Sequence, residues 1–421
     1  MKNRSESVSQ NEASQEGKAP KLRFPEFRDA PEWQNRRIGY FLIGQSREIK
    51  KPDKPYTGLG IRSHGKGTFL KKFQEPEKNS MDRLYTVESN DLVVNITFAW
   101  EGAIAIANDC DHGALVSHRF PTYTFNPSKA NSDFVRQIIT TKDFVYKLFL
   151  ISPGGAGRNR VMNKKDFLDI KIFLPELEEQ QKIAECLSSL DELISAHTQK
   201  LDTLKAHKKG LMQQLFPEEG ETVPKLRFSE FRDAHEWEEK FLGKEATIVM
   251  GASPKSEFYN EDRNGLPLLQ GNTDIKNRIS APRIFTSQIT KECQKGDILL
   301  SVRAPVGTVA KSIHHACIGR GMAAIRVKND NSQEFLYQWL LSFEPRWQNI
   351  SQGGTFDAVN SDAIRNLITS LPSETEQQKI ADCLSSLDEL ITAQTQKLDR
   401  LKTHKKGLMQ QLFPSADEMT G

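Results

Sequence analysis

The sequence has few cysteines and no long apolar run, and both absences narrow the class of protein. Five cysteines are an odd number, and no two of them form a CxxC pair in this 421-residue chain. This argues against a disulfide framework and against a zinc ribbon. No run of about eighteen apolar residues is present to span a bilayer, and the N-terminus does not resemble a signal peptide. We therefore expect a protein of the reducing cytoplasm with no membrane association.

Motifs of common enzymes are also missing. Residues 58–67, GLGIRSHGKG, have the wrong spacing for a GxxxxGK[ST] phosphate loop and lack its final Ser or Thr. No NPPY-like or DPPY-like tetrapeptide of an amino-methyltransferase occurs, and no histidines have the spacing of a metal site with a carboxylate base. We expect this chain to have no catalytic, cofactor-binding or metal-binding residues, and not to be an enzyme.

Length and charge set broader limits. A chain of 421 residues is longer than one hydrophobic core usually organises, so we expect two or more domains. The net charge of +3 neither demands nor excludes nucleic acid, because a basic face can be hidden in a balanced total. Residues 1–19 are polar and lack aromatics, which predicts a disordered tail.

An internal repeat in two pieces organises the chain. Residues 20–33, PKLRFPEFRDAPEW, recur at 224–237 with 12 of 14 positions identical. Residues 180–217 recur at 377–414 with 33 of 38 positions identical. The segments between these pieces share little beyond short motifs. The chain therefore has the order module, helix, different module, same helix.

The longer repeated piece is predicted to be a helix with a hydrophobic seam, because its apolar residues alternate at spacings of four and three. His197 and Lys208 fill the remaining seam positions in one copy, and Gln394 and Lys405 fill them in the other; we expect these polar residues to set the register. Each helix follows a proline and opens with glutamates that complement the helix dipole. The predicted seam residues are Ile183, Leu187, Leu190, Ile194, Leu201, Leu204, Leu211 and Leu215, and in the second copy Ile380, Leu384, Leu387, Ile391, Leu398, Leu401, Leu408 and Leu412.

A single leucine seam is more typical of a core helix in a bundle, but two nearly identical copies favour pairing of the helices with each other. The module between them lets the chain return, so the helices would run antiparallel and the modules would lie at opposite ends of a pseudo-twofold structure. Identical helix faces would also offer one docking surface twice. The simplest partner is then a protein bound in two copies.

Each module ends in a strand with a proline, and the helix after it opens with Glu-Gln and an isoleucine. The segments are IFLPELEEQQKIAECL at 172–187 and ITSLPSETEQQKIADCL at 368–384. This combination, present twice, resembles the DNA specificity subunits of type I restriction-modification systems, which defend against foreign DNA. The resemblance covers about residues 20–414, and the lead-ins that end at Trp33 and Trp237 also resemble the opening of recognition domains in this family.

The resemblance implies an α+β fold, in which two mixed α/β target-recognition domains are separated by two long helices that form an antiparallel, pseudo-twofold coiled coil. The implied segments are a tail at 1–19, target-recognition domain 1 at 20–174, spacer helix 1 at 175–217, target-recognition domain 2 at 218–371, spacer helix 2 at 372–414 and a tail at 415–421.

The resemblance also implies a function. The chain would be a non-catalytic subunit that reads a bipartite, asymmetric target in double-stranded DNA. Its partners would be two copies of a methyltransferase (modification) subunit and two restriction subunits that act as nuclease and translocase. S-adenosylmethionine, ATP and Mg would be bound by those partner subunits, and this chain would bind no cofactor.

Inside the modules, strand patterns alternate with Gly, Asn and Asp turns, and one short helical stretch is predicted late in each. Arg, Lys, Asn and Gln form the hydrogen bonds that distinguish bases in the major groove, so we expect DNA contacts from polar loops, although any one such residue could be an exposed loop residue without a ligand. The candidates are Arg62, Ser63, His64, Lys66, Lys71, Lys72, Arg158, Asn159, Arg160 and Lys164 in the first module, and Gln270, Asn272, Lys276, Asn277, Arg278, Arg303, Arg320, Thr355 and Asn360 in the second.

Two other function classes stay open on the sequence alone. The modules could bind two proteins or glycans as an adaptor with a coiled-coil spacer, or the chain could be an enzyme with an unrecognised site. The module loops are rich in Arg, Lys and Asn and poor in aromatic clusters, which favours DNA over the adaptor.

Overall fold

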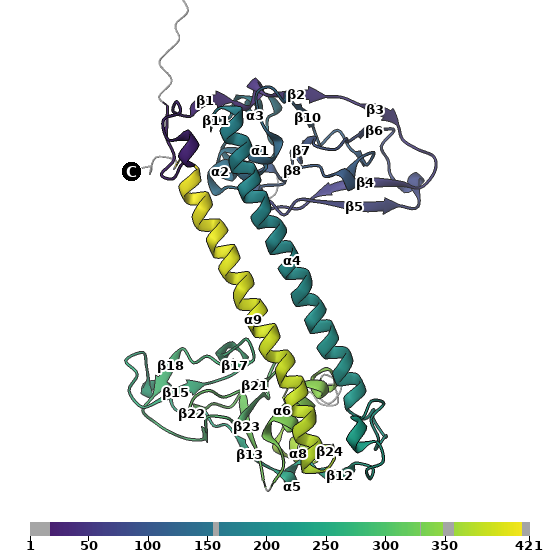
Figure 1. Ribbon diagram of the computed structural model, residues 1–421, viewed down its shortest axis with the longest axis vertical. Helices are drawn as coiled ribbons and strands as arrows, with labels where there is room; N and C mark the ends of the chain where they lie inside the picture. The colour runs from purple at the N-terminus through teal and green to yellow at the C-terminus, as the bar shows by residue number, and fades with distance from the viewer. Residues whose placement is uncertain (1–16, 155–159, 329, 348–357, 415–421) are drawn as a thin grey trace, which may run out of the picture. The chain divides into compact units, whose positions relative to one another are not determined.

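The computed structural model describes residues 17–154, 160–328, 330–347 and 358–414. Contacts between residues divide the chain into two compact units. Unit 1 takes in Met1–Ala196 and Leu398–Gly421, and unit 2 takes in His197–Lys397. The two long helices α4 (Leu177–Leu215) and α9 (Glu374–Leu412) each contribute residues to both units (Figure 1).

The sheets of unit 1 are a four-stranded sheet, a five-stranded sheet and a two-stranded ribbon. The strands are β1 (Gln34–Arg37), β2 (Leu42–Gln45), β3 (Glu48–Lys50), β4 (Tyr56–Ile61), β5 (Thr68–Phe73), β6 (Arg83–Thr86), β7 (Leu92–Val94), β8 (Ile104–Ile106), β9 (Leu115–Val116), β10 (Thr122–Phe125) and β11 (Lys171–Leu174). The sheets have the strand orders β2-β10-β7-β8 and β3-β6-β9-β4-β5. The ribbon pairs β1 antiparallel to β11, so the two ends of the module meet.

The sheets of unit 2 contain six, five and two strands. The strands are β12 (Glu238–Phe241), β13 (Ala246–Met250), β14 (Tyr259–Asn260), β15 (Leu266–Leu269), β16 (Ile275–Lys276), β17 (Ile279–Ser280), β18 (Ile284–Thr286), β19 (Glu292–Cys293), β20 (Ile298–Ser301), β21 (Val309–Lys311), β22 (Ala316–Ile318), β23 (Met322–Val327) and β24 (Ile368–Leu371). The orders are β13-β23-β20-β21-β17-β16 and β14-β18-β15-β22-β19, and the ribbon pairs β12 with β24.

The two units share a strand topology although their module sequences diverge. The order β2-β10-β7-β8 in unit 1 matches β13-β23-β20-β21 in unit 2, which then adds β17 and β16. The parallel pair β4–β9 in the second sheet of unit 1 matches the parallel pair β15–β22. In both units an antiparallel neighbour flanks each member of that pair. One topology is therefore built twice from different residues.

Unit 1 has more helix late in its module than the single short stretch that the sequence predicts. The helices are α1 (Ser132–Ile139), α2 (Lys142–Leu150) and α3 (Lys164–Asp169). Asn131 and Thr141 cap α1 and α2, since their side chains accept hydrogen bonds from the N–H groups of Phe134 and Phe144. In unit 2 the helices are α5 (Leu242–Glu245), α6 (Gln333–Phe343) and α8 (Ser361–Arg365), so the second module also has more than one helix, α6 and α8, in its later part.

Within each unit, parts of α4 and α9 lie antiparallel, and all sixteen predicted seam residues are buried or half-buried. In unit 2 the Gln394 amide donates hydrogen bonds to His197 Nδ1 (2.7 Å) and to the His197 carbonyl (2.9 Å). Lys208 Nζ lies 2.6 and 2.7 Å from the two carboxylate oxygens of Asp388. Burial lowers the pKa of Lys208, and the Asp388 carboxylate opposes that shift. In unit 1 Lys405 makes the same pair with Asp191 at 2.6 Å.

The end of a helix completes the hydrophobic core of each module. Phe413, which follows α9, contacts Trp33 and Phe134 with ring centroids 6.0 and 5.5 Å apart. Phe216, which follows α4, contacts Trp237 and Phe335 at 6.4 and 5.5 Å. Aromatic pairs of this kind add about 0.5–1.5 kcal/mol beyond the burial of their area. Each core therefore combines the start of one long helix with the end of the other.

The repeated lead-ins fold into arms held by a buried ion pair. Arg23 donates to both carboxylate oxygens of Glu179 (2.8 and 2.6 Å) and to the carbonyl oxygens of Ala30 and Pro31, farther along the same arm. Arg227 repeats this arrangement in unit 2 with Glu376 and the corresponding carbonyl groups. The glutamates are the first residue of each Glu-Gln pair, which explains that half of the motif.

The glutamine of each Glu-Gln pair joins the helix to its module. The Gln180 side chain accepts from the Asn131 N–H (2.9 Å) and donates to the Pro175 carbonyl (2.9 Å). Gln377 accepts from the Ser332 N–H and donates to the Pro372 carbonyl, each at 3.0 Å. Buried amides need such partners, and here both partners are fixed backbone groups.

We expect Arg227→Ala to destabilise unit 2 by about 3–5 kcal/mol, because Glu376 would remain as a buried, unpaired carboxylate. The side chain of Glu376 is 1% exposed, and that of Arg227 is 8% exposed. Hydrogen exchange of the amides at the start of α9 and in β24 would measure the loss. The control is Lys379→Met, which removes an exposed pair with Glu230 and should change stability by less than about 1 kcal/mol. Equal losses in the two variants would contradict the assignment of a buried ion pair.

Candidate nucleic-acid interface

In unit 2, glycines allow several chain segments to meet where β15, β20 and β22 end. A Cβ atom on Gly321 would lie 2.3 Å from the carbonyl oxygen of Gln270, and one on Gly251 would lie 2.2 Å from the carbonyl oxygen of Gly319. The Val302 N–H donates to the Gly321 carbonyl at 2.9 Å. We call these segments, residues 251–253, 269–271, 302–303 and 319–322, the glycine cluster.

Three of the predicted DNA-contacting residues belong to the glycine cluster. Arg320 Nε donates to Ser253 Oγ at 3.3 Å, and its terminal nitrogens have no partner among the described residues. The exposed side chain of Arg303 forms no ion pair within the described part of the chain. The Gln270 N–H donates to the Asp274 carboxylate at 2.7 Å, which fixes the backbone at that residue. Unengaged guanidinium and amide groups are the groups that form paired hydrogen bonds with purine edges.

The hairpin of β16 and β17 carries three further candidates, and one of them already forms an ion pair within the module. Lys276 pairs with Ile279 across β16 and β17, and Asn277 and Arg278 form the turn, with φ of +51° and +64°. Two successive positive φ values are typical of a type I′ turn. Arg278 is paired with Glu344 and also donates to the Val309 carbonyl at 3.1 Å. Its guanidinium is therefore already engaged inside the module, unlike those of Arg303 and Arg320.

The remaining candidates of the second module lie in separate places. Asn272 is the first residue of a 3-10 helix, Asn272–Asp274. Asn360 caps α8, since its side chain accepts a hydrogen bond from the Ala363 N–H at 2.8 Å. This gives Asn360 a structural task, as Asn163 has at the start of α3. Thr355 lies outside the described residues.

In unit 1, Arg62, Ser63, His64 and Lys66 occupy the loop between β4 and β5. Ser63 Oγ donates to the Glu101 carboxylate at 3.0 Å, and the His64 N–H donates to the Glu101 carbonyl at 2.7 Å. The Arg62 guanidinium donates to the Thr68 carbonyl and lies over the Phe69 ring. Lys66 is exposed. The loop is therefore held in place by its own polar residues.

The other first-module candidates are dispersed. Lys71 and Lys72 are exposed on β5, and both line a cavity of about 680 Å³ along that strand. Lys164 is the exposed first residue of α3, and Arg160 lies 4.3 Å from the centroid of the Phe149 ring. Arg158 and Asn159 lie outside the described residues.

Backbone hydrogen bonds identify first-module residues that sequence reasoning missed. The Ile96 carbonyl accepts a hydrogen bond from the Met162 N–H (2.9 Å). In the second module the Val302 carbonyl accepts one from the Val359 N–H in the same way (3.0 Å). The Ile96 N–H also donates to the Arg119 carbonyl (3.0 Å), which makes Arg119 the counterpart of Gly321.

His118 is then the counterpart of Arg320, and both His118 and Arg119 are exposed. Neither side chain has a hydrogen-bond partner among the described residues. Residues 117–119 share no motif with residues 319–321. The one sequence feature that could have shown the two loops to be equivalent is the short apolar strand before each of them.

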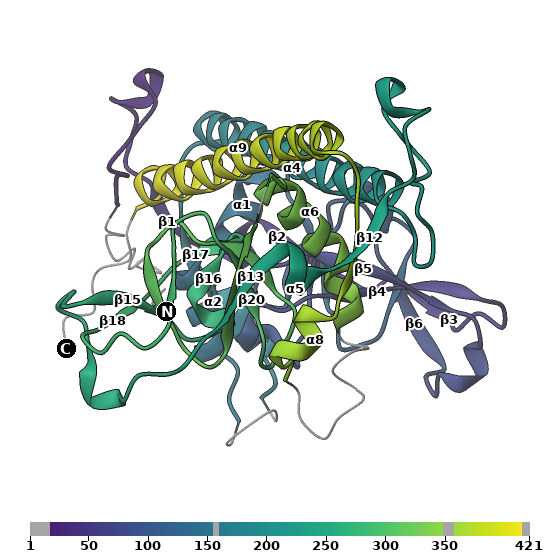
Figure 2. The same cartoon turned by 90° about the horizontal axis from the view of Figure 1, so that it is seen from below.

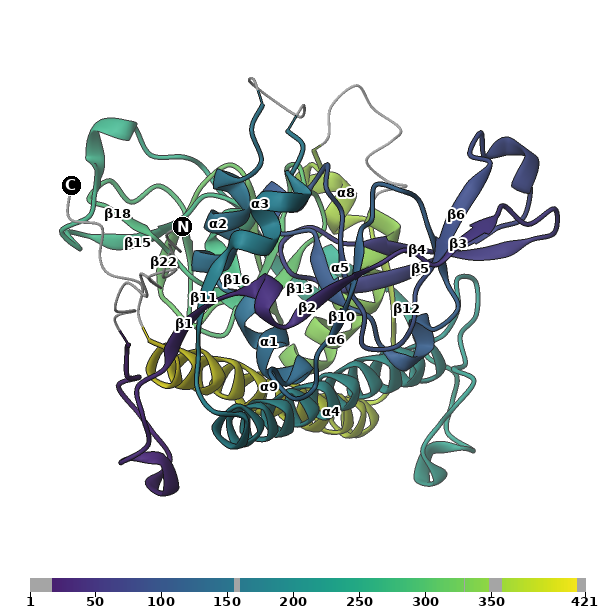
Figure 3. The same cartoon turned by 90° about the horizontal axis from the view of Figure 1, so that it is seen from above.

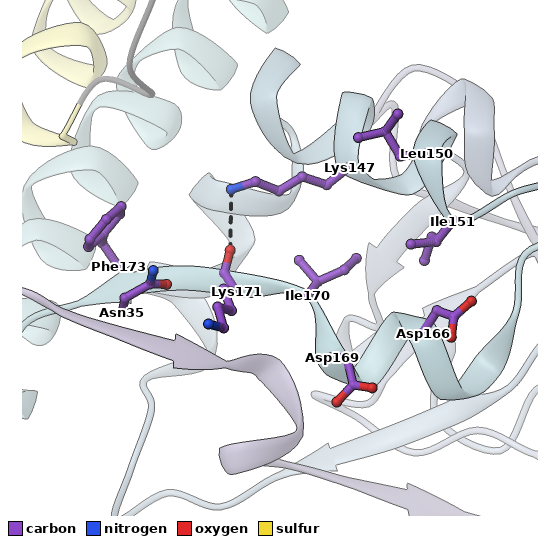
Figure 4. A pocket seen from close by; sticks show the side chains of 9 residues that line it. All are labelled: Asn35, Lys147, Leu150, Ile151, Asp166, Asp169, Ile170, Lys171 and Phe173. Atoms are coloured by element: carbon purple, nitrogen blue, oxygen red, sulfur yellow. Dashed lines mark hydrogen bonds between the residues drawn. The ribbon is translucent and has the colours of Figure 1, made fainter. Parts of the chain in front are cut away.

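A second cavity in unit 1, of about 540 Å³, lies beside the β1–β11 ribbon (Figure 4). Lys147 Nζ reaches the Lys171 carbonyl at 3.2 Å across it, and Asp166 and Asp169 lie along the α3 side. None of the predicted DNA-contacting residues lines this cavity. Its lining combines charged residues of both signs with the apolar residues Leu150, Ile151, Ile170 and Phe173.

Metal and membrane sites were sought in the same residues. Across the described ranges, no group of three or more His, Cys, Asp or Glu side chains is placed to hold a metal ion. None of the helices in those ranges is long and apolar enough to cross a membrane.

The chain belongs to the family of type I restriction modification DNA specificity domains, whose family model matches it twice, at residues 33–206 and 234–403. Over 258 residues it is 34% identical to the MjaX protein of Methanocaldococcus jannaschii, which is named as a type I restriction enzyme specificity subunit; the match covers 60% of each chain. It is 26% identical over 272 residues to the MjaVIII specificity subunit of the same organism, covering 60% of this chain and 63% of that one. The matches span about three fifths of the length of these curated relatives.

Two solved structures are similar in fold. A chain from a structure of type I R-M system assembly and conformational transition is 24% identical with a TM-score of 0.55, covering 91% of this chain and 98% of that one. The type I restriction-modification S subunit from M. genitalium is 16% identical with a TM-score of 0.64, covering 94% and 99%. The predicted α+β fold with long helices is thereby confirmed.

We expect Gly321→Ala to disrupt the glycine cluster, because the new methyl group would meet a backbone oxygen that cannot move alone. The loss of stability should be about 1–3 kcal/mol, as for other overpacked sites, with shifts of the Gln270 and Arg320 amide resonances. Gly271→Ala is the matched control, since a Cβ there meets nothing within 4 Å and the backbone is extended. If both variants are as stable as the parent, the segments do not pack as described.

Proposed function

We propose that this chain is the DNA specificity subunit of a type I restriction-modification complex, in which each module reads one half of a bipartite, asymmetric target. The observation that carries this proposal is the repeated topology with different side chains. At matching places the first module has His118 and Arg119, and the second has Arg320 and Gly321. Equivalent positions with different hydrogen-bonding groups suit two different half-sites.

The proposal includes partners. Two methyltransferase subunits would bind the repeated faces, and two restriction subunits would join them on the DNA. Leu193 and Leu390, matching positions of the two helices, are 48% and 54% exposed, which supports a partner that covers the same surface twice. S-adenosylmethionine, ATP and Mg would be bound by the partners, and this chain would catalyse no step. Since the double-stranded DNA that it would bind lies in the cytoplasm, we place the chain there.

Salt dependence separates this proposal from the adaptor hypothesis. Phosphate contacts release counterions, so binding of the chain with its methyltransferase to random duplex DNA should weaken steeply as salt rises. An adaptor for proteins or glycans would show no such binding. Methylation or cleavage by the purified chain alone would instead indicate an enzyme.

We expect methylome sequencing to find an asymmetric target with two half-sites roughly one helical turn apart. Arg320→Ala should relax the sequence specificity at one base pair of the second half-site, since one bidentate contact contributes about 1–3 kcal/mol of discrimination between bases. Arg119→Ala should alter the first half-site only. Each unaffected half-site is an internal control. A palindromic parent target, or relaxation of both halves by one substitution, would contradict the assignment of one module to each half-site.

We also expect residues 1–217 to form an antiparallel homodimer that directs methylation to a palindrome of the first half-site. Leu211, Met212, Leu215 and Phe216 repeat the residues that α9 contributes to the core of unit 1, so a second copy can supply them. Lys208 of one copy would pair with Asp191 of the other.

Size-exclusion chromatography with light scattering would give the mass of this fragment, and methylome sequencing would give its target. The control is Phe216→Ala in the fragment, which removes the ring that would lie on Trp33 and should weaken the dimer. A folded fragment that stays monomeric would refute the exchange of helix ends.

A further inference from the structure

The two arms, residues 20–33 and 224–237, carry identical residues that the fold does not use. Arg23, Phe24, Glu26 and Trp33 have packing or pairing roles that recur in the second arm, and those roles account for their repetition. The tips, Phe27-Arg28-Asp29 and Phe231-Arg232-Asp233, are also identical. Their repetition needs another reason.

The charged residues of the tips lack partners in the chain. Arg28 and Asp29 are exposed, as are Arg232 and Asp233, and none of the four side chains forms a hydrogen bond or ion pair among the described residues. Phe27 and Phe231 are half-buried but belong to neither module's core. In Figures 2 and 3 each arm projects clear of the sheets of its own unit.

Exposed positions beside the tips have diverged, which provides a comparison within the chain. Position 25 is Pro where its counterpart 229 is Ser, and position 31 is Pro where 235 is His. All four of these residues are exposed. The arms thus tolerate change where a side chain only meets solvent, yet the tips are the same twice.

The same hydrogen bonds and ion pairs anchor both arms, so each tip is held in the same way against its unit. The Leu22 N–H donates to the Gln411 carbonyl at 3.0 Å in unit 1, and the Leu226 N–H donates to the Gln214 carbonyl at 2.9 Å in unit 2. Lys182 pairs with Glu26, and Lys379 pairs with Glu230, both at 3.1 Å. Each tip is therefore held against the start of one long helix and the end of the other.

The charge of the tips favours a protein over nucleic acid. Over residues 20–33 the first arm has three carboxylates, Glu26, Asp29 and Glu32, and three basic residues, Lys21, Arg23 and Arg28, and the second arm has the same balance. An arm with no excess of basic residues lacks the basic face that binds the phosphates of nucleic acid. A guanidinium beside a carboxylate and a half-buried ring instead suits a protein surface with an acidic group, a basic group and an apolar contact.

We propose that the two arm tips are docking sites for one protein partner, the methyltransferase subunit, with one copy bound at each arm. This proposal rests on the proposed function, which supplies the two-copy partner. Arg28 and Arg232 each pair with a carboxylate of the partner, and Phe27 and Phe231 supply the apolar contact.

The test uses the full chain with the methyltransferase subunit encoded alongside it, and native mass spectrometry to count bound copies. Arg28→Glu or Arg232→Glu alone should leave one copy bound, with the altered site at least tenfold weaker. The double variant should lose both copies. Pro31→His, which converts one diverged position to its counterpart, is the matched control and should keep two copies.

The outcomes separate the two proposals. If the parent chain binds two copies and the double variant still binds two with an unchanged Kd, the arm proposal is wrong and the proposed function stands. If the parent chain binds no methyltransferase, the proposed function fails, and the arm proposal fails with it. A melting temperature that drops in the double variant but not in Pro31→His would show that the tips serve the fold, and would also overturn the arm proposal.

Discussion

Each module depends on an aromatic contact with a helix end that belongs to the other repeat. Trp33 and Phe134 enclose Phe413, and Trp237 and Phe335 enclose Phe216. Without that ring, each core would open at the surface where its own long helix begins. The near-identity of the helix ends follows from this constraint, since both must fit the same pair of aromatic rings.

The repeats and the seam were predictable because they are strong periodic signals over many residues. The role of the Glu-Gln pair was not predictable from the sequence. Glu179 pairs with an arginine 156 residues away, and the Gln180 side chain accepts a hydrogen bond from the backbone of the distant Asn131. The partners of the seam lysines were missed for a related reason. Asp191 and Asp388 lie outside the apolar stripe in sequence and reach Lys405 and Lys208 only after the helices pair.

The DNA-contacting candidates were harder to predict, since a loop residue's task depends on its neighbours in space. Arg278 and Arg320 look alike in sequence, yet one is paired with Glu344 and the other has free terminal nitrogens. Asn360 has the residue type of a base-reading side chain but caps a helix. Strands of two or three residues, such as β9, give too weak a pattern to show that Arg119 and Gly321 are equivalent.

Because each module takes a helix end from the other repeat, the order in which the two units acquire all their core residues differs from their order along the chain. Unit 2 is one continuous stretch of chain, His197–Lys397, and has all its core residues once that stretch is made. Unit 1 needs Phe413, which lies 380 residues after Trp33. The module that leaves the ribosome first is therefore completed last, and its aromatic surface waits uncovered through the synthesis of nearly the whole chain.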